Sequence, residues 1–172
     1  MRYAGFGLWM KKRYWAFSII SFWIILIDQW TKYVVQQRLT LYHRVEVIPE
    51  FFNLTHVRNA GGAFGIFGGE KGGIGSLLFV FVSLVAIGII IFLFVRVKEG
   101  EKNLSLSFSL VLSGAIGNLI DRLRYGEVID FLDFHLFSFH WPAFNVADTA
   151  ICIGIGLMAL ELLVKDRQKL LS

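Results

Sequence analysis

The chain has 172 residues, of which 56% are hydrophobic, 16% are aromatic and only 17% are charged. Its mean hydropathy of +0.63 exceeds that of soluble globular domains, so the composition excludes an ordinary soluble protein and indicates an integral membrane protein. The net charge of +4 does not indicate nucleic-acid binding, because the basic residues cluster beside apolar segments instead of forming one continuous patch.

Four apolar segments approach the roughly 20 helical residues that cross a bilayer core about 30 Å thick. The predicted spans are residues 14–35, 74–95, 104–123 and 146–164. The first has only 14 uncharged residues before Asp28, about 21 Å of helix, so a full crossing carries Asp28 and Lys32 to membrane depth. No small-x-small cleavage pattern follows it, which predicts an uncleaved anchor rather than a signal peptide.

Basic residues outside these spans predict the orientation of the chain. Ten lie in the N-terminal segment, the connection near residues 96–103 and the C-terminal segment, whereas five lie in the other two connections. The positive-inside rule therefore places both termini in the cytoplasm, and connections 36–73 and 124–145 outside.

The outer connections differ in composition. "VEVIPEFFNLTHVRN" in residues 36–73 predicts short strands, and the glycine-rich "NAGGAFGIFGGEKGG" after it predicts a flexible loop. The aromatic residues of "FLDFHLFSFHWPAF" in residues 124–145 are typical of the membrane interface. We therefore expect a single membrane domain over residues 1–172, an all-α bundle of four transmembrane helices with a small extracytoplasmic β-sheet.

Polar residues at membrane depth converge at the outer ends of the predicted spans. They are Asp28 and Lys32 in the first span, Asn118, Asp121 and Arg122 in the third, and Asn145 and Asp148 at the start of the fourth, with Asp130 in the connection between the last two. Asp28 and Lys32 stand four residues apart, and Gly114 begins the helical stripe that continues through Asn118. Ionisable residues inside a membrane are costly, so a functional role is the default expectation.

Simpler structural roles are open for each residue taken alone. Asp28 and Lys32 could form an ion pair that fixes helix packing, and Asp121 could be an interfacial anchor. Asn145 could cap the fourth helix, with Asp148 complementing its dipole. One alternative function is a small transporter or channel subunit whose acidic residues line an ion path, but the acids here gather at one membrane face, which disfavours such a path. A structural assembly factor is the other alternative.

Two neighbouring aspartates suit hydrolysis without a metal. They share a proton, so the charged one activates water while the protonated one polarises the amide, as in aspartic proteases. Asp148, at a helix N-terminus, is the better candidate for the ionised partner. The chain has no HExxH motif, and Cys152, within an apolar helix, is predicted to be a buried packing residue.

Five ordered motifs resemble the bacterial lipoprotein signal peptidases, or signal peptidase II. They are "DQWTK", "RNAGGAFG", "GAIGNLIDR", "VIDF" and "FNVADT", and they extend over nearly the whole chain. Two departures are small: the family more often has alanine where Gly62 stands and often serine where Thr149 stands.

The resemblance implies an aspartic endopeptidase that cuts diacylglyceryl-modified prolipoproteins just before the lipidated cysteine, with Asp130 and Asp148 as the catalytic dyad. It also implies a set of supporting positions: Asp28, Lys32, Asn59, Gly114, Asn118, Asp121, Arg122, Asn145 and Ala147. The implied location is the bacterial cytoplasmic (inner) membrane, with the active site at the outer leaflet. Membrane lipids and globomycin-type peptide antibiotics are implied partners, and no metal, cofactor or nucleic acid is expected. The loop around Gly61, Gly62 and Gly65 could close over the site.

Overall fold

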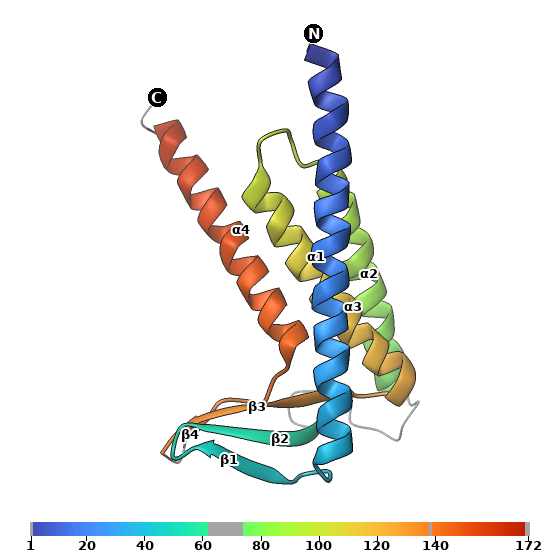
Figure 1. The fold of residues 1–172 in the computed structure, drawn as a ribbon, viewed down its shortest axis with the longest axis vertical. Helices are drawn as coiled ribbons and strands as arrows, with labels where there is room; N and C mark the ends of the chain where they lie inside the picture. The colour runs from blue at the N-terminus through green and yellow to red at the C-terminus, as the bar shows by residue number, and fades with distance from the viewer. Residues whose placement is uncertain (1, 62–73, 138, 171–172) are drawn as a thin grey trace.

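The computed structural model describes residues 2–61, 74–137 and 139–170. These residues form helices α1 (Arg2–Arg38), α2 (Ile74–Val95), α3 (Lys102–Tyr125) and α4 (Val146–Leu170), and strands β1 (Arg44–Ile48), β2 (Phe52–Asn59), β3 (Val128–Leu136) and β4 (Phe139–His140). The sheet lies across one end of the helix bundle, and both chain ends lie at the opposite end (Figure 1). The glycine-rich loop predicted as a lid falls largely outside the described residues.

The four predicted helices are present, and α2 has the predicted limits. Three helices are long and apolar enough to cross a membrane, over Gly75–Val95, Lys102–Tyr125 and Val146–Gln168. α1 has 37 residues, about 55 Å of helix, and extends beyond the predicted 14–35 at both ends. It is not among the three. The four-span prediction is thus supported for three helices, and the crossing by α1 stays a prediction.

α3 occupies the centre of the bundle and contacts α1, α2 and α4. Small residues, among them Ser107, Ser113 and Gly114, line its buried face, and both serine hydroxyls donate to carbonyls four residues back. Gly154 of α4 packs so closely that an added Cβ would lie 2.8 Å from the Ser107 carbonyl oxygen. Small residues at helix contacts permit the close backbone approach on which packing in lipid depends.

The distribution of side chains is that of a protein surrounded by lipid. Phe81 and Leu163 are 64% and 68% exposed, whereas Asp28 and Lys32 are 0% and 1% exposed. The charged side chains of Asp28 and Lys32, within the apolar segment of α1, therefore face the interior of the bundle, whereas large apolar side chains face outward, as the cost of exposing charge to hydrocarbon requires.

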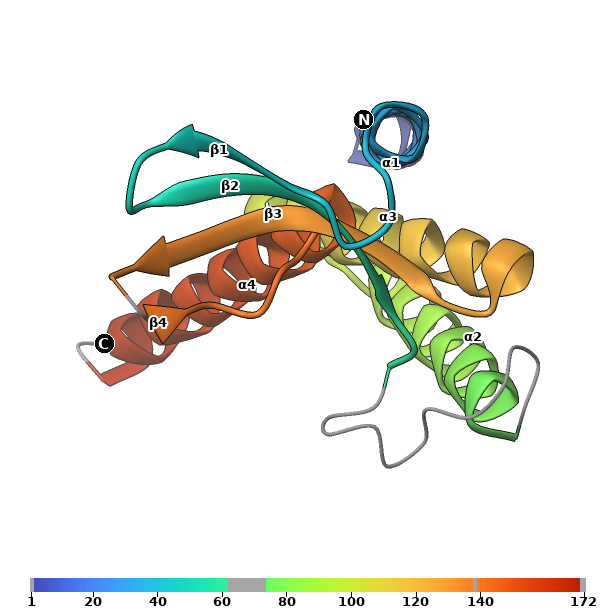
Figure 2. The same cartoon turned by 90° about the horizontal axis from the view of Figure 1, so that it is seen from below.

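The sheet is antiparallel, in the order β1-β2-β3-β4. Seen from its own end of the molecule, β3 crosses below the helices and β2 lies between β3 and β1 (Figure 2). The strands predicted in residues 36–73 are confirmed as β1 and β2. β3, which pairs with β2 and β4, was missed: the residues at its start, Val128–Phe131, are buried on both faces, so no polar alternation marks it.

A glycine cap brings β3 close to the end of α3. Gly126 adopts a left-handed conformation with φ 77°, and its N–H donates to the Arg122 carbonyl oxygen at 2.9 Å. This conformation ends helices without the steric cost that a side chain would add. β3 then begins at Val128, so Asp130 lies just below the polar end of α3.

Candidate functional site

Asp130 is held between two asparagine side chains. It is 2% exposed, its Oδ1 accepts from Asn145 Nδ2 at 2.7 Å, and its Oδ2 accepts from Asn59 Nδ2 at 2.9 Å. Asn59 pairs in register with Val128 of β3, which places it diagonally opposite Asp130 on the same face of the sheet. The sheet and the start of α4 together set the orientation of this carboxyl group.

Asp148 lies in the first turn of α4, as predicted. Its Oδ1 accepts from Asn118 Nδ2 at 2.7 Å, and its Oδ2 accepts from the backbone N–H of Asn145 at 3.3 Å. In return, Asn145 Oδ1 accepts from the backbone N–H of Asp148 at 2.9 Å. This reciprocal arrangement is a capping box, so the N-cap prediction for Asn145 is confirmed and the cap also orients Asp148.

Asn145 links the two aspartates. It is fully buried, and its Nδ2 bonds Asp130 and also Asn118 Oδ1 at 3.2 Å, while Asn118 Nδ2 bonds Asp148. The pKa of Asp130 is raised to about 6, chiefly by burial and in smaller part by the charge of Asp148, against the lowering effect of the hydrogen bonds from Asn59 and Asn145. The charge of Asp148 therefore acts on Asp130, to which Asn145 and Asn118 also link it.

A buried ion network lies directly behind the two aspartates. Lys32 Nζ lies 2.9 Å from Asp28 Oδ2 and 2.8 Å from Asp121 Oδ2, and it donates to Asn118 Oδ1 at 3.1 Å. The predicted Asp28–Lys32 pair is confirmed. Asp121 is 1% exposed and belongs to the same network, so it is not an anchor facing the interface.

The two carboxylates of this network each hold a backbone N–H next to a candidate catalytic residue. Asp28 Oδ1 accepts from the N–H of Ala147 at 2.9 Å, and Asp121 Oδ2 accepts from the N–H of Ile129 at 3.1 Å. Ala147 immediately precedes Asp148, and Ile129 immediately precedes Asp130. The network thus connects helices α1 and α3 to the backbone on which both aspartates stand.

The remaining predicted positions lie around this core. Gly114 packs against the fully buried Ala147, whose carbonyl oxygen would lie 2.3 Å from an added Cβ, so α4 can approach only a glycine here. Arg122 Nη1 donates to the Asn118 carbonyl oxygen at 3.4 Å, and its guanidinium lies 5.7 Å from the centre of the Phe79 ring. The stripe predicted on α3 therefore faces the site.

Two further participants were not predicted. Gln29 Nε2 donates to Asp121 Oδ1 at 3.0 Å and to the Gly117 carbonyl oxygen at 3.2 Å, joining α1 to α3. At Gly117 an added Cβ would lie 2.6 Å from Asp28 Oδ2. Gln29 was detectable as a polar neighbour of Asp28 within the apolar segment, but the close approach at Gly117 depends on tertiary packing.

An open pocket of about 400 Å³ adjoins Asp148. Its lining consists mostly of apolar side chains from the start of α4 and the segment before it: Trp141, Pro142, Ala143, Phe144, Asp148, Thr149, Cys152 and Ile153. The prediction that Cys152 is a buried packing residue is wrong, since this side chain is exposed and lines the pocket. Within the described residues, no group of three or more His, Cys, Asp and Glu side chains is arranged to hold a metal ion.

Comparisons with known proteins agree on one family. The family model described as Signal peptidase (SPase) II matches residues 20–164. The lipoprotein signal peptidase of Syntrophus aciditrophicus is 42% identical over 160 residues, covering 93% of this chain and 99% of the relative. That of Geobacter metallireducens is 43% identical over 160 residues, covering 93% and 98%. A solved structure described as a bacterial membrane enzyme superposes with a TM-score of 0.79 at 32% identity, covering 90% of this chain and 91% of that one.

Proposed function

The chain belongs to the signal peptidase II family, the lipoprotein signal peptidases, and on that premise we propose that it is an aspartic endopeptidase that removes signal peptides from prolipoproteins. The catalytic pair is Asp130 and Asp148. The bond cleaved lies just before a cysteine that already carries diacylglycerol. The observation that carries the proposal is the linkage of these two aspartates through Asn145 and Asn118.

The environments of the two aspartates suit different protonation states. Burial raises the pKa of Asp130 to about 6, which favours its protonated form. Asp148 accepts hydrogen bonds from Asn118 and from the Asn145 N–H at a helix N-terminus, an environment that stabilises a carboxylate. We therefore assign Asp130 as the acid and Asp148 as the base.

Hydrolysis then follows as a balanced proton exchange. Asp148 takes a proton from water as the water oxygen attacks the scissile carbonyl carbon, and Asp130 gives its proton to the carbonyl oxygen. In the second step the C–N bond breaks. Asp148 passes its proton to the leaving amine, and Asp130 recovers a proton from the hydroxyl that becomes the new carboxyl group. Asn59 and Asn145 keep Asp130 oriented through both steps.

The location of the pair suits a lipid-anchored substrate. Four helices cross the bacterial cytoplasmic membrane with both termini in the cytoplasm, and the sheet and the dyad lie at the outer leaflet. α1 can reach membrane depth because its charged residues Asp28 and Lys32 are hidden within the bundle. Exposed cations such as Lys12 and Lys102 gather at the end opposite the dyad, which favours this orientation. A diacylated cysteine held in the outer leaflet would then present its peptide bond at the level of the dyad.

The apolar pocket beside Asp148 is a candidate binding site for substrate and inhibitors. The pocket can receive apolar portions of a substrate, or of a globomycin-type peptide antibiotic that occupies the dyad.

Cleavage of a diacylated prolipoprotein by the purified protein tests the proposal. We expect Asp130→Asn and Asp148→Asn each to lower kcat by at least about 10³-fold, as the loss of a general acid or base does. Asp133→Asn is the matched control, because Asp133 is also a buried aspartate of β3 but bonds Asn53 Nδ2 at 3.0 Å, away from the dyad. Full activity in either folded dyad variant would refute the aspartic mechanism.

A further inference from the structure

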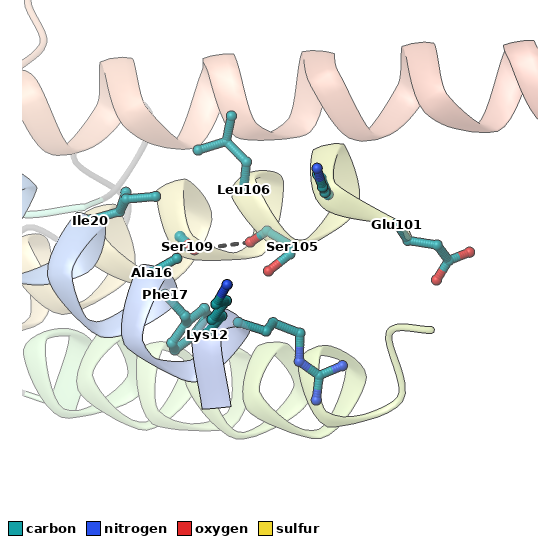
Figure 3. Close-up of a pocket in the computed structure, with 10 residues that line it drawn as sticks. Lys12, Ala16, Phe17, Ile20, Glu101, Ser105, Leu106 and Ser109 are labelled. Atoms are coloured by element: carbon teal, nitrogen blue, oxygen red, sulfur yellow. Dashed lines mark hydrogen bonds between the residues drawn. The ribbon is translucent and has the colours of Figure 1, made fainter. Parts of the chain in front are cut away.

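A second cavity lies between α1 and α3 at the end of the bundle opposite Asp130 and Asp148, and it encloses about 310 Å³. Its lining residues come from the first half of α1 and the start of α3: Lys12, Arg13, Ala16, Phe17, Ile20, Glu101, Lys102, Ser105, Leu106 and Ser109. Figure 3 shows the labelled side chains of α1 beside those at the start of α3. None of these residues belongs to the catalytic site described above.

The wall of the cavity is apolar. Ala16, Phe17, Ile20 and Leu106 are among its lining residues, and most of the lining surface is apolar. The Ser109 hydroxyl donates to the Ser105 carbonyl oxygen at 2.9 Å, so it is bonded within its own helix (Figure 3). Such a wall fits a hydrocarbon chain better than a polar solute, because a polar solute would lose hydration without equivalent replacement.

The rim of the cavity is positively charged. Lys12 and Lys102 are both exposed, and Lys102 is the first residue of α3. The acidic residue of the lining, Glu101, is already bonded to Lys165 Nζ at 2.6 Å and to the backbone N–H of Lys98 at 2.7 Å. The rim therefore keeps an excess of positive charge where apolar helices meet the aqueous boundary.

We propose that this cavity binds one anionic phospholipid. An acyl chain lies between α1 and α3 against Phe17 and Leu106, and the headgroup phosphate lies between Lys12 and Lys102. Basic pockets between transmembrane helices recognise anionic headgroups in this way, and the apolar wall accounts for the lipid tail. The cationic n-region of a signal peptide is the competing occupant, but a rim of the same charge repels it.

Lipid retention by the purified, full-length protein tests this site. The protein, in a neutral detergent, is titrated separately with phosphatidylglycerol and phosphatidylcholine, and bound lipid is counted by native mass spectrometry. We expect one phosphatidylglycerol to be retained with roughly a 25-fold preference over phosphatidylcholine, since each of the two lysines contributes roughly a fivefold gain and the two gains multiply.

Two pairs of variants separate the charge and the cavity. Lys12→Ala/Lys102→Ala removes the preference, whereas the control Lys98→Ala/Arg167→Ala, which alters two exposed cations outside the lining, keeps it. Ala16→Phe fills the cavity and abolishes retention of the single lipid, while Ile19→Phe, at a 50% exposed position outside the lining, does not.

Two outcomes would overturn the proposal. Equal loss of preference in both double variants would mean that the lipid senses only the overall charge of this end of the protein. Unchanged lipid retention in Ala16→Phe, together with a raised KM for a prolipoprotein, would assign the cavity to the substrate instead.

Discussion

Lys32 is the residue whose loss should disturb this protein most, because one ammonium group serves two buried carboxylates. The Lys32 ammonium lies 2.9 Å from Asp28 Oδ2 and 2.8 Å from Asp121 Oδ2. In Lys32→Met both carboxylates would lose this cation, and because they are only 0% and 1% exposed, water would not replace it. Removing one partner of a buried ion pair costs about 3–5 kcal/mol, since the charge left behind is uncompensated. We expect Lys32→Met to lower the free energy of unfolding by at least this amount.

The assay is thermal unfolding in detergent, followed by tryptophan fluorescence. For a chain of this length, 1 kcal/mol corresponds to about 2–4 °C in Tm, so a loss of about 6–20 °C is expected. Lys165→Met is the matched control: its partners, Glu101 at 2.6 Å and Glu161 at 3.4 Å, are partly exposed, and solvent-exposed ion pairs contribute little to stability. Lys32→Met/Asp121→Asn should recover part of the loss, because it removes one uncompensated charge.

Equal Tm values for Lys32→Met and Lys165→Met would refute this reasoning. They would mean that the carboxylates of Asp28 and Asp121 are neutralised by protonation or by water, and that the network does not depend on the lysine.

Four further outcomes are expected. Asp130, with its pKa raised to about 6, must be protonated to act as the proposed acid, so kcat/KM should fall as the pH rises through about 6. Asn59→Ala removes a hydrogen bond that lowers the pKa of Asp130, so the fall of kcat/KM should move to higher pH. If the fall of kcat/KM stayed at the same pH, it would not arise from Asp130. Gly114→Ala should lower the free energy of unfolding by about 1–3 kcal/mol, because the added Cβ would meet the Ala147 carbonyl oxygen. Gly156→Ala is the control and should not lower it, because nothing lies within 4 Å of the added Cβ. Asn145→Ala should lower kcat by about 10²-fold or more with little change in KM, since the aspartates lose their common partner.

The helices were predictable because long apolar segments dominate this sequence. The limits of α2 follow from a run of 22 residues without a charge. The i,i+4 spacing of Asp28 and Lys32 was enough to predict their ion pair, since it is a property of a single helix. The capping role of Asn145 is likewise local, because the cap bonds lie within four residues.

Contacts between distant segments could not be predicted in the same way. The pairing of Val57 with Asp130 places β3 beside β2, yet β3 is buried on both faces at its start and has no alternating pattern to mark it. The bonds of Asp28 to the Ala147 N–H and of Asp121 to the Ile129 N–H also depend on packing among elements far apart in the chain. Residue types indicated a polar cluster, but not which backbone groups it would hold.

The ion network explains how a small bundle in lipid can hold two aspartates on different elements in one geometry. Lipid tails are as apolar as leucine side chains, so hydrophobic burial alone cannot specify how such helices are oriented. Lys32 joins α1 to α3, and the carboxylates it neutralises extend this connection to the residues before Asp148 and Asp130. A shift of α1 against α3 would therefore move both aspartates at once. The ion pair that first suggested a purely structural role thus also positions the two aspartates of the proposed dyad.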